Sequence, residues 1–302
     1  MSHDLSSDAV AAIVSGGVDL HGRSSAAAGQ VGDLLDVARD AAAAGLEAIV
    51  FMDRHFPPTP LVQTLRNHEF AQSRTTLLSG IELNSAVGGL NVYAVEHELM
   101  LGGRVVSMPT ISAANHIRQF GRDGGATRDA RRRHPAIEVL DPWGEPLDAV
   151  KNILDVIAAH DAVLATGHLH VSEIGPLLAH ASRRGVNRFL VTHSTFETGM
   201  SMADMRDFAA MGAFVEQCVD GGTDCLGGHI PSEHARAFIA AASVSQTILV
   251  PRNSRTGHRG IGQRLGATVR CGVDLGYREG EVRQMISTNA MRLLGLPGKD
   301  RG

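Results

Sequence analysis

The sequence predicts an α/β fold in which eight parallel strands close into a (β/α)8 TIM barrel. Short apolar runs alternate with longer amphipathic segments about eight times along the 302 residues, which is a suitable length for this fold. The apolar runs are continuous, as in LEAIVFM at 46–52, and this is typical of strands buried on both faces. An open doubly wound sheet is the alternative, but the segment GRSSAAAGQ at 22–30 lacks the G-x-G-x-x-G loop often found there.

Each predicted strand is a short apolar run, and turn residues bound several of them. Pro109, for example, stops the run GRVVSMPT. In chain order, the strand-like runs are Val18–His21, Leu46–Met52, Thr75–Leu83, Val92–Val95, Gly103–Thr110, Val163–His168, Arg188–His193, Ala213–Val219 and Thr247–Val250.

The predicted helices are amphipathic and are bounded by residues that favour helix ends. Gly45 and Gly185 each follow a predicted helix, and Ser172 is a candidate N-cap. The predicted helices are Asp33–Ala44, Pro146–His160, Ser172–Arg184, Ser201–Met211, Pro231–Ser243 and Glu281–Leu294.

Residues 118–135, RQFGRDGGATRDARRRHP, interrupt the alternation with six Arg, two Asp and three Gly. Because this segment has almost no apolar side chains, we expect a mobile surface loop. It follows the fourth barrel strand, so it would lie on the catalytic face. A solvated charge run and a basic lid over an anionic substrate are the two interpretations.

The composition excludes several classes of protein. A net charge of −4 argues against a nucleic-acid binder or a protein of anionic membranes. No apolar run is long enough to cross a membrane, and the first residues do not resemble a secretory signal. Cys218, Cys225 and Cys271 cannot form a paired framework, so we expect free thiols. We therefore expect a cytoplasmic protein. No stretch other than residues 118–135 resembles a linker, so we expect one domain over residues 1–302. We also expect a homo-oligomer, with a small anionic substrate as the partner that the basic segment 118–135 suggests.

Metal-binding residue types collect where the predicted strands end. The active site of a barrel lies at the carboxyl ends of its strands. Neutral imidazole is the commonest metal ligand, and three such ligands with an open position make a catalytic zinc site. The sequence therefore predicts a cluster that holds one divalent metal, zinc first, with manganese or iron as alternatives. The strand-end residues are His21, His55, Glu82, His168, His170 and His193.

At these strand ends the chain resembles the amidohydrolase superfamily of metal-dependent hydrolases. The motifs that carry this resemblance are D-L-H at 19–21, T-G-H at 166–168, V-T-H at 191–193 and the closing segment at 276–296. Other segments are similar to a little-characterised amidohydrolase-like branch of unknown function: H-F-P-P-T at 55–59, A-V-G-G-L-N at 86–91, M-P-T-I-S-A-A-N-H at 108–116 and L-A-T-G-H at 164–168.

The resemblance implies a hydrolase of a small amide, cyclic amide or ester with His21, His168 and His193 as metal ligands. The first strand of the superfamily usually ends in H-x-H, whereas Arg23 stands at the second of these positions here. A guanidinium has no lone pair for a metal. The only lysines, Lys151 and Lys299, are badly placed for the bridging carbamate of a two-metal site. One metal is therefore expected.

The usual last-strand Asp is also missing, because Arg252 or Asn253 stands in its place. A base must then come from elsewhere, and four residues are candidates by position: Asp53, His55, Glu82 and His170. The candidate substrate-binding residues are Arg23, Asn91, His116 and Arg252.

By the period of two in a strand, Arg23 should point into the barrel mouth with His21. There it would bind a substrate carboxylate or pair with Asp19, Asp53 or Glu82.

Two other functions fit the same sequence. Loss of the last-strand Asp removes the usual hydrolytic base, and two Arg in the mouth favour a polyanionic substrate, so a lyase on the same barrel is one alternative. A metal-free ligand-binding protein is the other. Elemental analysis separates the metal-free alternative from the two enzymes.

Overall fold

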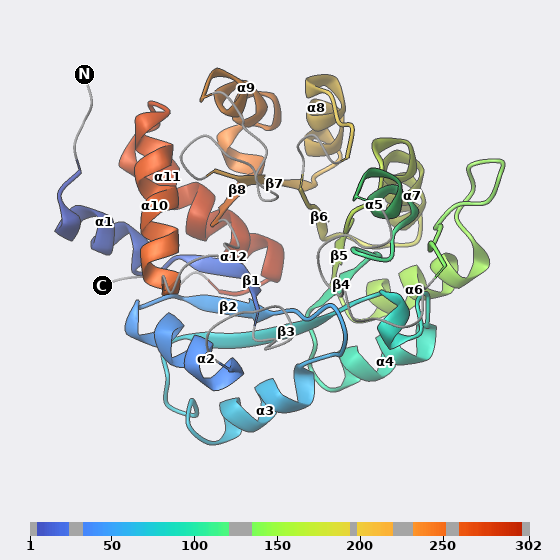
Figure 1. The fold of residues 1–302 in the computed structure, drawn as a ribbon, viewed down its shortest axis with the longest axis horizontal. Helices are drawn as coiled ribbons and strands as arrows, with labels where there is room; N and C mark the ends of the chain where they lie inside the picture. Colours follow the sequence, from blue (N-terminus) through green and yellow to red (C-terminus); the bar gives the residue numbers. More distant parts are fainter. Residues whose placement is uncertain are drawn as a thin grey trace.

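Eight parallel strands, each paired with the next along the chain, form the centre of the protein. β1 also contacts β8, so the two edges of the sheet meet, and helices surround the strands (Figure 1). The fold is the predicted (β/α)8 barrel. This computed structural model describes residues 5–23, 33–120, 135–193, 198–219, 232–251 and 260–297. The strands are β1 Val18–Gly22, β2 Ala48–Phe51, β3 Thr76–Glu82, β4 Val105–Ser107, β5 Val163–Ala165, β6 Phe189–Val191, β7 Phe214–Cys218 and β8 Thr247–Val250.

Every helix predicted from the sequence is present. The last one, predicted over Glu281–Leu294, contains a π-helical turn at Gln284–Thr288, and its final residues pack against the interior of the barrel. Asp33 is the N-cap of α2, because its side chain accepts a hydrogen bond from the Asp36 N–H at 3.0 Å. The helices are α1 Ser7–Val14, α2 Leu34–Ala43, α3 Thr59–Asn67, α4 Val92–Met100, α5 Ala114–Phe120, α6 Asp148–Ala159, α7 Val171–Arg183, α8 Met202–Ala210, α9 Ser232–Ala242, α10 Ile261–Asp274, α11 Glu279–Arg283 and α12 Asn289–Leu294.

Two predictions about individual elements are wrong. Residues 92–95 begin helix α4 instead of forming a strand, because Asn91 accepts hydrogen bonds from the N–H groups of Tyr93 and Ala94 and so caps a helix. The N-cap of α7 is His170, not Ser172. Of the predicted loop 118–135, the first three residues belong to α5, and residues 121–134 lie outside the described part.

The core has two layers. Inside the barrel, small and branched strand side chains such as Val18, Val50 and Val163 pack together. Outside it, strand residues such as Ile49 and Val106 pack against the helices. Every residue of β2 is buried, which is the expected result of a continuous apolar run in a covered parallel strand. No helix in the described ranges is both long enough and apolar enough to cross a membrane.

One carboxyl is buried between β3 and the helices, away from the strand ends. Glu98 of α4 is 3% exposed, and the Thr59 hydroxyl donates to its Oε1. The Thr59 hydroxyl also lies 2.6 Å from Ser79 Oγ. Burial raises the pKa of Glu98 above its ordinary value, although the hydrogen bond from Thr59 acts in the opposite direction.

Glu98→Gln is therefore expected to stabilise the protein at pH 8 and to change little at pH 4. Because the folded pKa is raised, the stability that the neutral carboxyl contributes is present at low pH and is lost as the pH rises through that pKa. Glutamine stays neutral throughout. We expect a gain in Tm of about 2 °C at pH 8 in thermal unfolding, which corresponds to about 1 kcal/mol. Glu96→Gln, at an exposed position on α4, is the control and should show no gain. An equal gain for both variants at pH 8 would contradict this account.

Candidate active site

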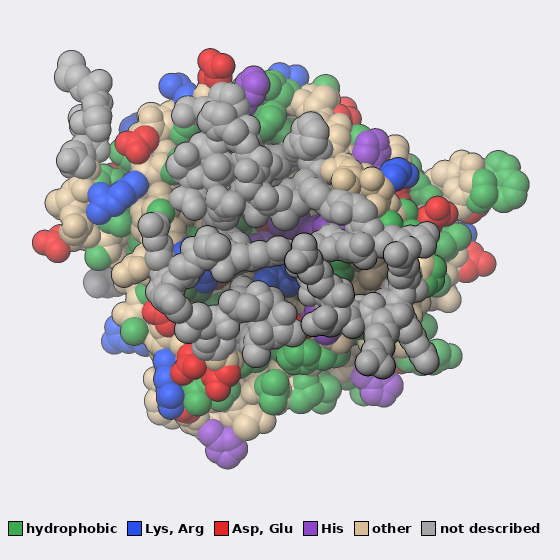
Figure 2. All heavy atoms as spheres, viewed as in Figure 1, with side chains coloured by type: hydrophobic (Ala, Val, Ile, Leu, Met, Phe, Trp, Pro, Cys, Tyr) green, Lys and Arg blue, Asp and Glu red, His purple; other side chains and the backbone are tan. Residues whose placement is uncertain are grey.

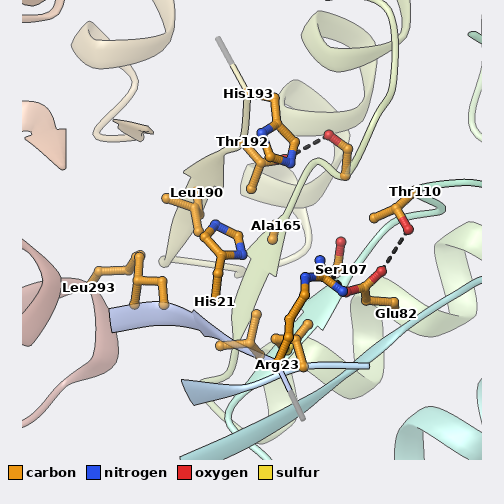
Figure 3. Close-up of a pocket in the computed structure, with 14 residues that line it drawn as sticks. His21, Arg23, Glu82, Ser107, Thr110, Ala165, Leu190, Thr192, His193 and Leu293 are labelled. Atoms are coloured by element: carbon orange, nitrogen blue, oxygen red, sulfur yellow. Dashed lines mark hydrogen bonds and ion pairs between the residues drawn. The ribbon is translucent and has the colours of Figure 1, made fainter. Parts of the chain in front are cut away.

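A cavity opens at the carboxyl ends of the strands and extends into the barrel. Its deeper wall is apolar and includes Leu20, Val105, Ala165, Leu190 and Leu293, whereas its upper wall is polar and includes His21, Arg23, Glu82, Thr110, Thr192 and His193. Figure 3 shows these side chains around the space. In Figure 2, histidine and arginine side chains are visible near the middle of the face.

A carboxylate joins two of the histidines across the barrel. Glu216 of β7 is fully buried, and its Oε2 lies 2.6 Å from His21 Nε2. Its Oε1 lies 3.6 Å from His193 Nδ1, and the rings of His21 and His193 are 5.9 Å apart and stacked.

These contacts change the protonation of both partners. Burial acts to lower the pKa of His21, but the charge of Glu216 and the hydrogen bond to it leave that pKa raised. Burial likewise acts to raise the pKa of Glu216, but the neighbouring imidazoles leave it lowered. Both shifts favour a charged imidazole at His21 and an ionised carboxylate at Glu216.

A second pair of histidines lies beside the first. The Nδ1 atoms of His168 and His116 are 2.7 Å apart, and the ring of His168 lies 4.9 Å from that of His193. Burial and the charge of Arg54 lower the pKa of His116 to about 4. Burial, partly opposed by Glu216, lowers the pKa of His193 to about 4, and burial with nearby charges lowers that of His168. These three imidazoles are neutral at pH 7, so each has one N–H and one lone pair. One of the two lone pairs of His116 and His168 is used in the contact between their Nδ1 atoms.

The third group is a buried ion pair on the opposite wall. Arg23 Nη2 lies 2.9 Å from Glu82 Oε1, and the Thr110 hydroxyl donates to Glu82 Oε2 at 2.6 Å. Asn84 accepts from the Thr110 N–H and fixes that turn. Burial acts to raise the pKa of Glu82, but the charges of Arg23 and Arg54 and the Thr110 hydrogen bond leave it lowered, so Glu82 is ionised.

The backbone around the histidines is tightly constrained. Gly167 has a φ of +61°, and a Cβ there would lie 2.3 Å from Met108 O and 2.5 Å from Pro109 O. This close approach allows the His168 N–H to donate to Pro109 O at 3.0 Å. His193 has a φ of +50°, a backbone conformation that residues other than glycine rarely adopt. Local strain of this kind is frequent at functional sites.

The structure brings together six of the residues singled out from the sequence. They are His21, Arg23, Glu82, His116, His168 and His193. Arg23 has a protein partner, Glu82, which is one of the alternatives that the sequence left open. Its Nε is buried and has no hydrogen-bond partner among the residues that the structure describes.

Four other residues of the prediction are placed differently. Asp53 accepts from the His55 N–H at 2.8 Å, and neither residue lines the cavity within the described part. Asn91 caps α4, and His170 caps α7, with Nδ1 2.8 Å from Ser172 Oγ. His170 does not share the orientation of His168, because β5 ends at Ala165 and the period of two no longer applies. Arg252 lies outside the described residues.

Sequence reasoning missed Glu216, Arg54 and Asn84. Glu216 gave a usable signal, because it is the one charged residue in the predicted strand AFVEQCV at 213–219. Arg54 and Asn84 follow strand ends but have no distinguishing pattern around them.

The donor atoms suit a divalent metal in their chemistry, because imidazole nitrogen and carboxylate oxygen are the usual ligands of zinc. Within the described ranges, the buried Nδ1 of His193 has no hydrogen-bond partner, which supports this fit. In the described part of the chain, however, no three His, Cys, Asp or Glu side chains are grouped so that they could hold a metal ion. Two of the expected ligands are instead hydrogen-bonded, His21 to Glu216 and His168 to His116.

Solved structures of hydrolases share this fold. An amidohydrolase from Pseudomonas aeruginosa matches with a TM-score of 0.64 and 12% identity, covering 95% of this chain and 97% of that one. A probable dipeptidase from the same organism matches with a TM-score of 0.61 and 9% identity, covering 95% and 96%. A probable 2-pyrone-4,6-dicarboxylic acid hydrolase from Acinetobacter baumannii, with citric acid bound, gives 0.57 and 10%, covering 93% and 100%.

This likeness confirms the resemblance to amidohydrolases at the level of the fold. No curated protein matches the chain. A family model described as "Family of unknown function (DUF6282)" matches residues 16–216, which agrees with the expectation of a little-characterised branch. The chain therefore belongs to the DUF6282 family.

Proposed function

We propose that the protein is a hydrolase of a small amide, cyclic amide or ester, with one divalent metal held by His21, His168 and His193. The observation that carries this proposal is that the three rings lie near one another just beyond β5 and β6 and in β1, with the ring centroid of His193 4.9 Å from that of His168 and 5.9 Å from that of His21. Metal binding would require His21 and His168 to turn lone pairs toward a common point that their side chains do not yet share. The similar solved structures, two of them only probable in their assignment, are an amidohydrolase, a dipeptidase and a pyrone-dicarboxylic acid hydrolase.

When bound, such a metal supplies a Lewis acid for the substrate carbonyl and acidifies water. The lowered pKa values of His168 and His193 keep both imidazoles neutral at pH 7, and a neutral imidazole can bind a metal directly. Glu216 holds His21 through Nε2, so Nδ1 of His21 would be the ligand atom, and metal binding there would displace the proton that the raised pKa of His21 favours. A carboxylate behind a ligating histidine is a common support in metal sites.

Glu82 is the candidate base that the structure favours. It lines the cavity and is ionised, whereas Asp53, His55 and His170 are not among the described residues of the cavity wall. Arg23 is the candidate residue for a substrate carboxylate, because it lines the cavity and its buried Nε has a hydrogen to donate and no acceptor in the described part of the chain. The relative with bound citric acid, which carries carboxylates, supports an acidic substrate.

Elemental analysis of the purified protein tests the proposal. We expect about one equivalent of zinc, manganese or iron in the wild type, and less than about a tenth of that in His168→Ala, because a three-ligand site has no surplus ligand. His170→Ala is the matched control, since this histidine caps α7 and should keep the metal. A wild-type protein that binds no metal would instead support a metal-free ligand-binding protein. Full metal content in His168→Ala would place the site elsewhere.

A further inference from the structure

Helix α5 contacts His168 at two points. Asn115 Nδ2 donates to the carbonyl oxygen of His168 at 3.1 Å, and His116 Nδ1 lies 2.7 Å from His168 Nδ1. Both imidazoles are buried, with 7% exposure for His116 and 4% for His168. The backbone and the ring of His168 are therefore both held by the same turn of helix.

The contact between the two Nδ1 atoms determines the tautomers. At 2.7 Å, one nitrogen must carry a hydrogen and the other must present a lone pair, because two N–H groups would repel. Because Nδ1 of His168 is occupied by this hydrogen bond, Nε2 is the ring nitrogen that remains for another partner. If His168 is the donor, its Nε2 presents a lone pair, whereas if it is the acceptor, its Nε2 carries a hydrogen and cannot bind a metal.

The position of His116 argues against direct contact with a substrate. Neither His116 nor His168 is among the described residues that line the cavity, whereas His21 and His193 are. The ring of His168 lies 4.9 Å from that of His193, and His116 contacts His168 through Nδ1. His116 contacts His168 much as Glu216 contacts His21. The Nδ1 atoms of His116 and His168 are 2.7 Å apart, and Glu216 Oε2 lies 2.6 Å from His21 Nε2. The two supports differ in charge, because the acceptor behind His168 is an imidazole and not a carboxylate.

We propose that His116 is a positioning residue for His168: its Nδ1 accepts the Nδ1–H of His168 and keeps the lone pair of His168 on Nε2 for the metal. This inference rests on the proposed metal site. It replaces the role that the sequence suggested for His116, which was substrate binding.

Zinc affinity, measured by competition with a chelator on full-length protein stripped of metal, is the first test. His116→Leu removes the acceptor and should weaken zinc binding about 10–100-fold, the usual effect of losing such a support. His116→Asn is the matched variant, because asparagine Oδ1 takes nearly the place of histidine Nδ1, and it should retain most of the affinity. Thermal unfolding of both variants checks that they are folded. Wild-type zinc affinity in folded His116→Leu would overturn the proposal.

The tautomer of His168 is the second test and needs no metal. In protein with ¹⁵N-labelled histidine, the imidazole resonances of His168, assigned with His168→Ala, should show the Nδ1–H tautomer in the wild type and lose it in His116→Leu. An Nε2–H tautomer in the wild type would overturn the positioning role even if zinc binds. If the wild type binds no metal, the proposed function fails, and the tautomer still decides whether His116 orients His168.

Discussion

Arg23→Met is expected to lower the free energy of unfolding by about 3 kcal/mol, because it leaves a buried carboxylate without its main partner. Glu82 is 2% exposed and lies 2.9 Å from Arg23 Nη2. Methionine keeps much of the volume of the arginine stem but has no charge. Breaking a buried ion pair costs about 3–5 kcal/mol. We expect the lower end of this range, because the charge of Arg54 also stabilises the ionised form of Glu82.

Urea unfolding followed by circular dichroism measures this effect. The double variant Arg23→Met, Glu82→Gln should recover most of the loss, since glutamine carries no charge that needs a partner. Arg39→Met is the matched control, because Arg39 pairs with Glu69 at the surface, where the two side chains are 56% and 41% exposed. Exposed pairs of this kind contribute about 0–1 kcal/mol. Equal losses for Arg23→Met and Arg39→Met would show that the buried pair does not stabilise the mouth of the barrel.

Gly167→Ala is expected to cost about 3 kcal/mol and to displace His168. A residue other than glycine pays about 1–2 kcal/mol to adopt a left-handed conformation. The added Cβ would also lie within 2.5 Å of two carbonyl oxygens of the segment after β4, and such overpacking typically costs about 1–3 kcal/mol. Because the next residue is a proposed metal ligand, zinc affinity should fall together with stability.

Gly212→Ala separates the cost of the left-handed backbone conformation from the cost of overpacking. Gly212 also has a positive φ, +87°, but a Cβ there would meet no atom within 4 Å. It should therefore show the conformational cost alone, about 1–2 kcal/mol, with unchanged zinc affinity. If Gly167→Ala loses no more stability than Gly212→Ala, the close approach of the β4 segment is not a constraint on this site.

Much of the barrel could be predicted because its strands are continuous apolar runs and its helices begin and end at residues with clear preferences. The segment from Val92 to Val95 misled the prediction, since a short apolar run does not distinguish a strand from the first turn of a helix. Helix α10 was missed for another reason: it contains Gly266, which lowers helix propensity. A Cβ at Gly266 would lie 3.3 Å from Val10 Cγ1, so tertiary packing explains the glycine.

The candidate site was predictable where a residue lies at a strand end, as His21, His168 and His193 do. It was not predictable where side-chain direction depends on turns. Beyond β5 the chain turns at Gly167, so His168 joins the cluster whereas His170 caps a helix. The pairing of Arg23 with Glu82 was one of several open alternatives, because a charge at a strand end does not identify its partner across the barrel.

The Arg23–Glu82 pair also limits the order in which these two positions could change during evolution. A histidine at position 23 would restore the H-x-H pattern, but if it came first it would leave Glu82 buried beside a weaker partner. If Glu82 changed first, for example to glutamine, the unpaired charge would be that of Arg23, which lines the cavity and is 11% exposed and so can be partly hydrated. A change between arginine and histidine at position 23 is therefore expected to cost less stability in a chain that already lacks the Glu82 carboxylate.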